Sequence, residues 1–506
     1  AHILLHRDLT QLPSWSESFF VTVVHEMGHA LGLQHTLTSS VMSTAWTSAS
    51  SKARPLDDDD RAGVSVLYPA DGYAATVGSI SGRVTLGGNG VSMASVVAIS
   101  DSSPAVSTLT NPDGTYQLDG LAQGIYYLYV HPLPPALSGE SNPANIFAPT
   151  LVDSPKVSFP ANIGFAAQFA PGTRDVNQAQ ILSVFAGKVK QNVNFTVSAR
   201  TQSIHSIRTY GYAPGSSVPV PSPPVNSALT LLADGAGLLQ NNNNATTPGL
   251  NVGVFGSFAY IPRSTVRLYQ APYIAMDLYL SNNINSLPPG RKHLLFSTNS
   301  ELYLLPSAFN LVTFGAPSIS SVNPGVDNAG NRIVTISGMN LFADTRVLFD
   351  GLDATPTPDS PLLDGSLVVY PPAASPGYTA GVVALGADGQ SSLYIQSPPS
   401  YTYDSGTLPA LSVSPYSLSP GDNVIDITGA NTNFIDCQTI VGFGSSDALV
   451  KNVTVLSPTH LTATVTVSQN AAASINSLSV TTGLQVISSA LGFQIGPASS
   501  QAAHHR

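Results

Sequence analysis

The sequence predicts a multidomain protein in which a small α+β part is followed by tandem all-β sandwiches. Three observations favour this fold class. The chain has 506 residues, which is too long for a single hydrophobic core. After Pro69, the pattern changes from helix to short alternating strands separated by turns of Gly, Pro and Asn. In the C-terminal half, related segments recur with a period of about 90 residues, which is typical of repeated domains.

Near the N-terminus, the sequence predicts a helix that carries a metal-ligand motif. A mostly apolar stretch at 18–24 leads into His25-Glu26-Met27-Gly28-His29-Ala30-Leu31-Gly32-Leu33-Gln34-His35. Because residues four apart project from the same face of a helix, His25 and His29 can offer two imidazoles to one metal. Glu26 lies beside the first ligand, where it can reach a metal-bound water without ligating the metal itself.

The end of this helix is predicted to bring in a third ligand. Gly32 accepts the left-handed conformation at little cost, so the helix can stop there and the chain can reverse. The turn then brings His35 back towards His25 and His29. Three protein ligands leave a fourth position open for water, as in catalytic and not structural zinc sites. We therefore predict one catalytic Zn²⁺ ion at these three histidines.

These residues resemble the active site of the metzincin zinc metalloproteases, and within them the matrixin-like branch. Met42, within Ser39-Ser40-Val41-Met42-Ser43, resembles the Met-turn, in which a methionine forms a hydrophobic floor under the histidines. The segment at 56–69 resembles the closing helix of bacterial matrixin-like domains, and residues 1–6 resemble the strand before the active-site helix. The resemblance covers residues 1–70 and implies an α+β metzincin catalytic fragment, with Gly32 and Met42 as structural residues near the site.

The resemblance also implies a function. It implies a zinc-dependent endopeptidase whose substrate is a polypeptide and in which Glu26 is the general base. A matrixin catalytic domain needs about 150 residues, within the usual size of a domain. We therefore expect the N-terminal part of this domain and a signal peptide to lie upstream of Ala1, and the protein to be secreted or held at the cell surface.

An acidic run, Asp57–Asp60, has two interpretations. As a Ca²⁺ site it lacks the alternating spacing of calcium-binding loops, so Ca²⁺ is a possible second ion that the spacing does not support. As the first turn of the closing helix, it would accept hydrogen bonds from free amides and complement the positive end of the helix dipole. We favour helix capping.

A β-sandwich is expected at 79–199, after a short Gly/Ala linker at 70–78. Asp113-Gly114 is a strong hairpin-turn signal. Because Asp113 and Asp119 each precede a Gly, we favour turns over a role of either residue as a calcium ligand. Tyr116, Leu118 and Leu121 can point into a core. In the last strand, one face would carry Val189, Val193, Phe195 and Val197 and the other polar residues, which fits a half-buried strand. This segment resembles the carboxypeptidase-regulatory-like module.

The C-terminal half contains two related segments. Arg332–Phe342 is echoed by Asn423–Phe434, and each follows a Pro-Gly opening. The period and the short strands predict tandem immunoglobulin-like sandwiches, which resemble IPT/TIG domains. We place them at 316–404 and 409–496. A divergent β-sandwich is expected at 200–315, where the late hairpin and the last strand resemble those of a third IPT/TIG-like copy.

Two expectations concern single residue types. Seven aromatic residues in the 200–315 segment could form a sugar-binding platform, but aromatic residues at strand positions are more typical of a core, which we favour: Tyr210, Tyr212, Phe255, Phe258, Tyr260, Tyr269 and Tyr273. The single cysteine, Cys437, is expected to be a small buried hydrophobic residue.

The composition excludes some classes of binding partner. Only 9% of residues are charged and the net charge is −10, which argues against nucleic acid as a partner. No run of about 18 apolar residues is present, so no membrane span is expected. The alternative to a secreted peptidase is a cell-surface adhesion, carbohydrate-binding or protein-binding protein with an incomplete, inactive protease end. In either case the β-modules would bind a cell-surface, polysaccharide or protein ligand.

Overall fold

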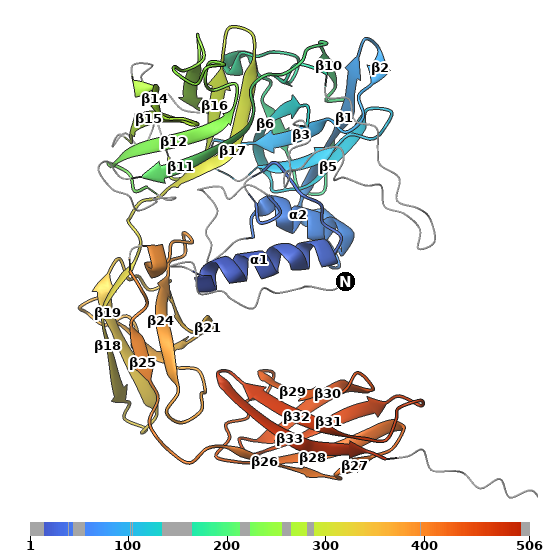
Figure 1. Ribbon diagram of the computed structural model, residues 1–506, viewed down its shortest axis with the longest axis vertical. Coiled ribbons are helices and arrows are strands. Elements are labelled where there is room, and N and C mark those ends of the chain that lie inside the picture. The colour runs from blue at the N-terminus through green and yellow to red at the C-terminus, as the bar shows by residue number, and fades with distance from the viewer. Residues whose placement is uncertain are drawn as a thin grey trace, which may run out of the picture. The chain divides into compact units, whose positions relative to one another are not determined.

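A computed structural model describes the chain in segments, over residues 15–38, 40–43, 56–101, 103, 105–133, 164–212, 223–255, 265–280, 288–394 and 396–496. They belong to two compact units: one is Ala1–Ala316 with Asp388–Gln390, and the other is Pro317–Ala387 with Ser391–Arg506. All α-helices among these residues lie before the first strand, and sheets follow (Figure 1). The predicted fold class, a small α+β part followed by immunoglobulin-like sandwiches, is confirmed.

The helical part consists of α1 (Trp15–Ala30), α2 (Asp58–Leu67) and α3 (Tyr73–Thr76). Helix α3 lies within the segment expected to be a linker. The expected strand at 1–6 lies outside the described residues. None of the helices in the described segments is long and apolar enough to cross a membrane.

The capping interpretation of the acidic run is confirmed. The Asp57 side chain accepts from the Asp58 amide at 3.1 Å, and the Asp60 side chain accepts from the Asp57 amide at 2.9 Å. The Asp57 side chain also accepts from the Asp60 amide, and this reciprocal pair of contacts between Asp57 and Asp60 forms a capping box, which satisfies amides that a helix N-terminus leaves free.

The first sandwich follows α3 and contains two sheets. In the first sheet, β1 (Gly78–Leu86) pairs with β2, β5, β9 and β10. In the second sheet, the strand order is β4-β3-β6-β7, and β8 pairs with β6. The remaining strands have the following bounds: β2 Asn89–Gly90, β3 Ser95–Ile99, β4 Val106–Leu109, β5 Thr115–Leu121, β6 Gly124–His131, β7 Gln168–Phe169, β8 Leu182–Val184, β9 Val189–Lys190 and β10 Phe195–Val197. Asp113 forms the expected turn, because its side chain accepts from the Thr115 amide at 3.0 Å.

The second sandwich has the sheets β11-β12-β15-β14 and β13-β16-β17. Its strands are β11 His205–Tyr212, β12 Ala228–Ala236, β13 Asn251–Val254, β14 Arg267–Gln270, β15 Tyr273–Tyr279, β16 Gly290–Ser297 and β17 Leu302–Leu311. The expected aromatic core holds only in part. Phe255 is buried, whereas Tyr269 is 62% exposed on an edge strand. Phe258 and Tyr260 lie outside the described residues.

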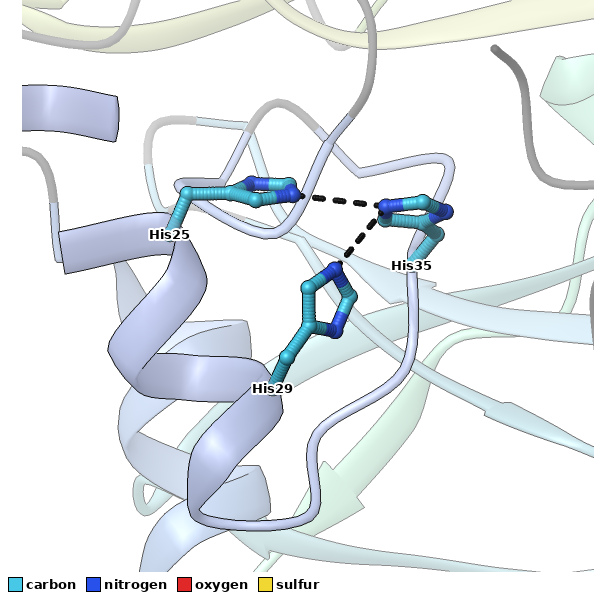
Figure 2. Close-up of side chains that lie close together, drawn as sticks. All are labelled: His25, His29 and His35. Carbon is cyan, nitrogen blue, oxygen red and sulfur yellow. Dashed lines mark hydrogen bonds between the residues drawn. The ribbon is translucent and has the colours of Figure 1, made fainter. Parts of the chain in front are cut away.

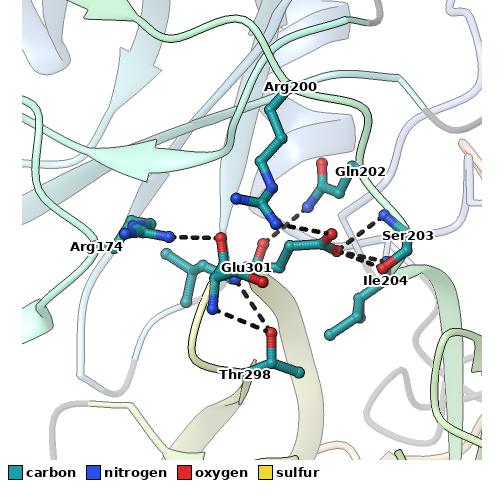
Figure 3. A network of polar contacts seen from close by, with 9 residues as sticks. Arg174, Arg200, Gln202, Ser203, Ile204, Thr298 and Glu301 are labelled. Atoms are coloured by element: carbon teal, nitrogen blue, oxygen red, sulfur yellow. Dashed lines mark hydrogen bonds and ion pairs between the residues drawn. The ribbon is translucent and has the colours of Figure 1, made fainter.

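The first two sandwiches share a hydrophobic cluster. Residues of the first, including Val97 and Phe169, pack with Phe255 and Leu304 of the second. A polar network lies beside this cluster (Figure 3), in which the Glu301 carboxylate accepts from the Ser203 amide at 2.8 Å. The two sandwiches are therefore packed together, and the boundary expected near residue 200 stays a prediction.

The second unit contains two further sandwiches, each with its own core. The first has the sheets β18-β19-β23-β22 and β21-β20-β24-β25, and the second has β26-β28-β31-β30 and β27-β33-β32-β29. The bounds are β18 Ser318–Val326, β19 Arg332–Met339, β20 Arg346–Phe349, β21 Leu352–Asp353, β22 Thr355–Pro356, β23 Leu367–Tyr370, β24 Thr379–Leu385, β25 Ser400–Thr402, β26 Ala410–Ser414, β27 Ser417–Leu418, β28 Gly421–Ala430, β29 Thr439–Phe443, β30 Ala448–Ser457, β31 His460–Val467, β32 Ser474–Thr482 and β33 Gln485–Ile495.

The repeat has a backbone counterpart. Asn340 follows β19 and Asn431 follows β28, and both have a φ of 54°. Asparagine tolerates this left-handed conformation better than most residues, so the same residue ends the corresponding strand in both copies. The expectation for Cys437 was wrong, because its side chain is exposed. Its positive φ of 60° places it in a turn before β29 and not in a strand facing the core.

Candidate metal centre

The three predicted ligands meet at one point. His25 and His29 lie on the same face of α1, and His35 comes from the loop after it (Figure 2). The Nε2 atom of His35 is 3.3 Å from that of His25 and 3.1 Å from that of His29. One nitrogen from each ring lies within 4.8 Å of the others, the only such group of potential ligands that the described segments contain.

The opposite nitrogens of two rings contact the backbone. His25 Nδ1 is 2.6 Å from the Val41 carbonyl oxygen, and His29 Nδ1 is 2.9 Å from that of Leu33. A carbonyl can only accept, so each Nδ1 carries the proton and each Nε2 presents a lone pair to the centre. Hydrogen bonds of this kind orient the histidines that bind metals in proteins.

This donor set fits zinc. Two ligand nitrogens bound tetrahedrally at the usual zinc–nitrogen distance lie roughly 3.3 Å apart. The separations of His35 Nε2 from His25 Nε2 and from His29 Nε2, 3.3 and 3.1 Å, match that value. Lone pairs that face each other at this distance repel, and a cation between them removes the repulsion.

Electrostatics keep His35 neutral. Burial, followed by the neighbouring His29 and His25, lowers the pKa of His35 to about 4. The negative charge of Glu26 raises the pKa of His35, against the larger lowering effects, so this carboxylate is near enough to interact electrostatically with the histidines. At neutral pH, His35 therefore holds the unprotonated form that binds a metal.

Gly32 makes the turn between the second and third histidines. Its φ is +100°, a conformation that L side chains rarely adopt. The Gly32 amide donates to His29 O and the Leu33 amide donates to Gly28 O, both at 3.0 Å, so the chain leaves the helix while its last carbonyls stay paired.

Met42 lies directly against α1, as expected for a hydrophobic floor. Its side chain is 2% exposed. A Cβ on Gly28 would lie only 2.3 Å from Met42 Sδ, so the methionine occupies the space that this glycine leaves open. Gly28 lies between the two helical histidines, and the sulfur therefore packs beneath them.

Asp60 holds the turn that contains Met42. Its carboxylate accepts from the Val41 amide at 3.0 Å and from the Met42 amide at 3.2 Å, in addition to its part in the capping box. Because Val41 O contacts the His25 ring, Asp60 supports that ring through one residue. Sequence reasoning assigned the acidic run to capping alone, and only its length, greater than a cap needs, could have signalled this second contact.

Asp59 was also missed. Its Oδ2 atom accepts from the hydroxyls of Thr36 at 2.7 Å and Thr38 at 2.5 Å, and its Oδ1 atom accepts from the Ser107 amide at 2.7 Å. Burial raises the pKa of Asp59 to about 6, although hydrogen bonds from Thr38, Ser107 and Thr36 act against the shift. No local pattern links Asp59 to Ser107, which lies in β4.

A pocket of about 320 Å³ opens beside His35. The loop at 32–37 and helix α2 form two of its walls, and residues 106–109 of the first sandwich contribute to a third. The space next to the third histidine is thus enclosed partly by a β-module.

Comparison with known proteins gives two family matches. The matrixin family model matches residues 10–69, the stretch that contains the three histidines, Glu26 and Met42. The IPT/TIG domain model matches residues 317–403. The sequence-based resemblances are confirmed over these two stretches. The carboxypeptidase-regulatory-like resemblance, and the IPT/TIG resemblance at 200–315 and 409–496, stay predictions. No curated protein matches.

Solved structures resemble the chain only distantly. The titin I-band fragment I67–I69 is 9% identical, covers 55% of this chain and 94% of its own, and has a TM-score of 0.16. The ICAM-5 D1–D4 ectodomain fragment is 12% identical, with 82% and 99% covered and a TM-score of 0.18. BcpA, the major pilin subunit of Bacillus cereus, is 11% identical, with 65% and 95% covered and a TM-score of 0.13. TM-scores this low say nothing further about function.

Proposed function

We propose that this protein is a zinc-dependent endopeptidase, with His25, His29 and His35 as the zinc ligands and Glu26 as the general base. The observation that carries the proposal is the convergence of three imidazole Nε2 atoms, with 3.1 and 3.3 Å between them. Two of the rings are oriented by carbonyl oxygens behind them. The matrixin match over residues 10–69 supports the same assignment.

The reaction would be hydrolysis of a peptide bond in a polypeptide substrate. When bound, zinc polarises the scissile carbonyl and lowers the pKa of a water to about 7. Glu26 follows His25 on α1 and is half-buried, with its charge felt at His35. Its carboxylate accepts the proton that the attacking water loses and delivers it to the leaving amine nitrogen as the carbon–nitrogen bond breaks.

Glu26→Gln tests this proposal in the full-length gene product, with gelatin and casein as substrates. Because general-base catalysis contributes about 10²–10⁴-fold, kcat should fall by that factor while the zinc content stays the same. Glu17→Gln, on the same helix but outside the motif, is the matched control and should keep the wild-type rate. A chelator should abolish cleavage, and added zinc should restore it.

A second candidate function is adhesion, in which the β-sandwiches bind a protein or polysaccharide outside the cell. It is favoured by the proportion of sandwich in the described chain and by the IPT/TIG match. If the wild type binds zinc and cleaves neither substrate, or if Glu26→Gln cleaves at the wild-type rate, the peptidase proposal fails. Binding of the protein to cell surfaces or polysaccharide without any proteolysis would then support adhesion.

A further inference from the structure

We propose that Asp59 is a positioning residue that ties the edge of the first β-sandwich to the loop carrying His35. In this arrangement the sandwich is a structural part of the metal centre and not an appendage joined to it by a linker. The inference deepens the proposed function and rests on it for the identity of the metal. The mechanical link between Asp59, the loop and the sandwich can be tested without any metal.

One side of the Asp59 carboxylate holds the loop. Thr36 is the residue directly after His35, and both its hydroxyl and that of Thr38 donate to Asp59 Oδ2, at 2.7 and 2.5 Å. The Thr36 amide also donates to Met42 O at 3.2 Å, so the same residue joins the loop to the turn under the histidines. The position of Thr36 therefore limits where the His35 ring can lie.

The other side of the carboxylate holds the sandwich. Ser107 donates its amide to Asp59 Oδ1 at 2.7 Å, and its hydroxyl lies 3.2 Å from Asp59 Oδ2. Strand β4 is an edge strand, paired only with β3 in its sheet. The Ser107 amide points to Asp59 and away from Val97, its partner on β3, so the bond uses an edge donor that the ladder leaves free.

Packing places the carboxylate firmly between its partners. Ala62, one turn after Asp59 on α2, belongs to the core of the first sandwich and is 4% exposed. A Cβ on Gly120 of β5 would lie 2.5 Å from Ala62 Cβ, so the helix approaches the sheet as closely as a glycine allows. Arg291 of the second sandwich contacts the Asp57 cap at 3.4 Å. Helix α2 is thus packed against the first sandwich and paired with an arginine of the second. Asp59, on this fixed helix, holds the loop through its hydrogen bonds with Thr36 and Thr38.

The proposal predicts that cutting the link loosens the third ligand. Asp59→Asn replaces one acceptor oxygen with a donor, and Ser107→Pro removes both the amide hydrogen and the hydroxyl. Proline is tolerated on an edge strand where the amide makes no ladder bond, so the sheet should stay intact. Ser107→Ala removes only the hydroxyl. Asp277→Asn is the matched control, because Asp277 accepts from the Thr230 hydroxyl at 2.9 Å on a sheet of the second sandwich.

Two measurements on the complete chain decide the outcome. Hydrogen exchange of residues 33–43 is measured in metal-free protein, and zinc release is followed with a chromophoric chelator. Asp59→Asn and Ser107→Pro should speed exchange in this segment and speed zinc release by about tenfold or more, the usual effect of losing support behind a ligand. Asp277→Asn should stay close to the wild type in both. Ser107→Ala keeps the amide but loses the hydroxyl contacts with Asp59 and Thr36, so it should change both less than Ser107→Pro does. The melting temperature of every variant shows whether it is folded.

The results separate this inference from the proposed function. Folded Asp59→Asn and Ser107→Pro variants with wild-type exchange at 33–43 and wild-type zinc release would overturn the positioning role. If Ser107→Pro does not fold, Asp59→Asn alone decides. If the wild type binds no zinc, the exchange data still show whether Asp59 holds the loop, and only the proposed function fails.

Discussion

At the scale of single residues, the candidate metal centre depends on two histidine nitrogens that carry no proton and on two glycines that have no Cβ atom. His25 and His29 each use Nδ1 on a backbone carbonyl, which leaves Nε2 free for a cation. Gly28 lacks the Cβ that would meet Met42 Sδ at 2.3 Å, so the methionine can lie against the helix. Gly32 supplies a backbone conformation that the histidine spacing needs and that few other residues adopt.

Gly32→Ala should separate backbone strain from packing. At a φ of +100° an alanine is strained, although the nearest atom to a Cβ there, Leu67 Cδ1, is at an ordinary 3.5 Å. We expect a loss of about 1–2 kcal/mol in the free energy of unfolding and weaker zinc binding. Urea denaturation and chelator competition measure these two quantities.

Gly253→Ala is the control for this substitution, because nothing lies within 4 Å of its Cβ position and its φ is not in the positive range. It should change neither quantity measurably. An alanine at Gly32 that behaves like the one at Gly253 would show that the turn does not need glycine.

At the scale of elements, α2 is short, yet the acidic residues at its N-terminus form hydrogen bonds with several other segments. Asp57 caps the helix, Asp59 reaches the loop and β4, and Asp60 reaches the turn under the histidines. Asp58 makes only an exposed pair with Arg61 at 3.6 Å. Four identical residues in a row therefore have different surroundings, because successive positions on a helix point in different directions.

Asp60→Ala should destabilise the protein far more than Asp58→Ala. The first change leaves three backbone amides without their acceptor, those of Asp57, Val41 and Met42. At about 1 kcal/mol or more for each unsatisfied donor, we expect a loss of about 3 kcal/mol. Exposed ion pairs contribute about 0–1 kcal/mol, so Asp58→Ala should be nearly neutral. Urea denaturation of both variants tests the contrast, and equal losses would contradict it.

At the scale of the whole molecule, the first unit joins the helical part to two sandwiches through buried polar contacts as well as apolar ones. In β16, Lys292 donates to Asp101 O and His293 contacts Ser100 O, both at 2.9 Å. His293 Nδ1 also accepts from the Ser307 amide at 2.8 Å. Both nitrogens of this ring are used by its neutral form, so the connection between the sandwiches is sensitive to acid.

This connection predicts how stability depends on pH. Burial lowers the pKa of His293 to about 4, below the 6.5 of an ordinary histidine. The unfolded chain therefore binds a proton at a higher pH than the folded chain does. Stability from this residue is complete above about pH 6.5 and is lost as the pH falls towards 4, by about 3 kcal/mol in total.

Urea denaturation at pH 4.5 and pH 7.5 measures this loss. His293→Gln cannot titrate, so its difference in stability between the two pH values should be smaller than that of the wild type. His131, also buried with a pKa of about 4, contributes in the same direction and is unaffected by the substitution. An unchanged pH difference in the variant would contradict the assignment.

Features that depend on residues close together in the chain could be predicted from the sequence alone. The spacing of His25, His29 and His35, the turn at Gly32 and the cap at Asp57 follow from helix periodicity and local backbone preference. Three other features are visible only in the folded chain: Asp59 joins Thr36 to Ser107, two sandwiches share one hydrophobic cluster, and Cys437 is exposed. These depend on how distant segments pack, and neither residue type nor spacing carries that information.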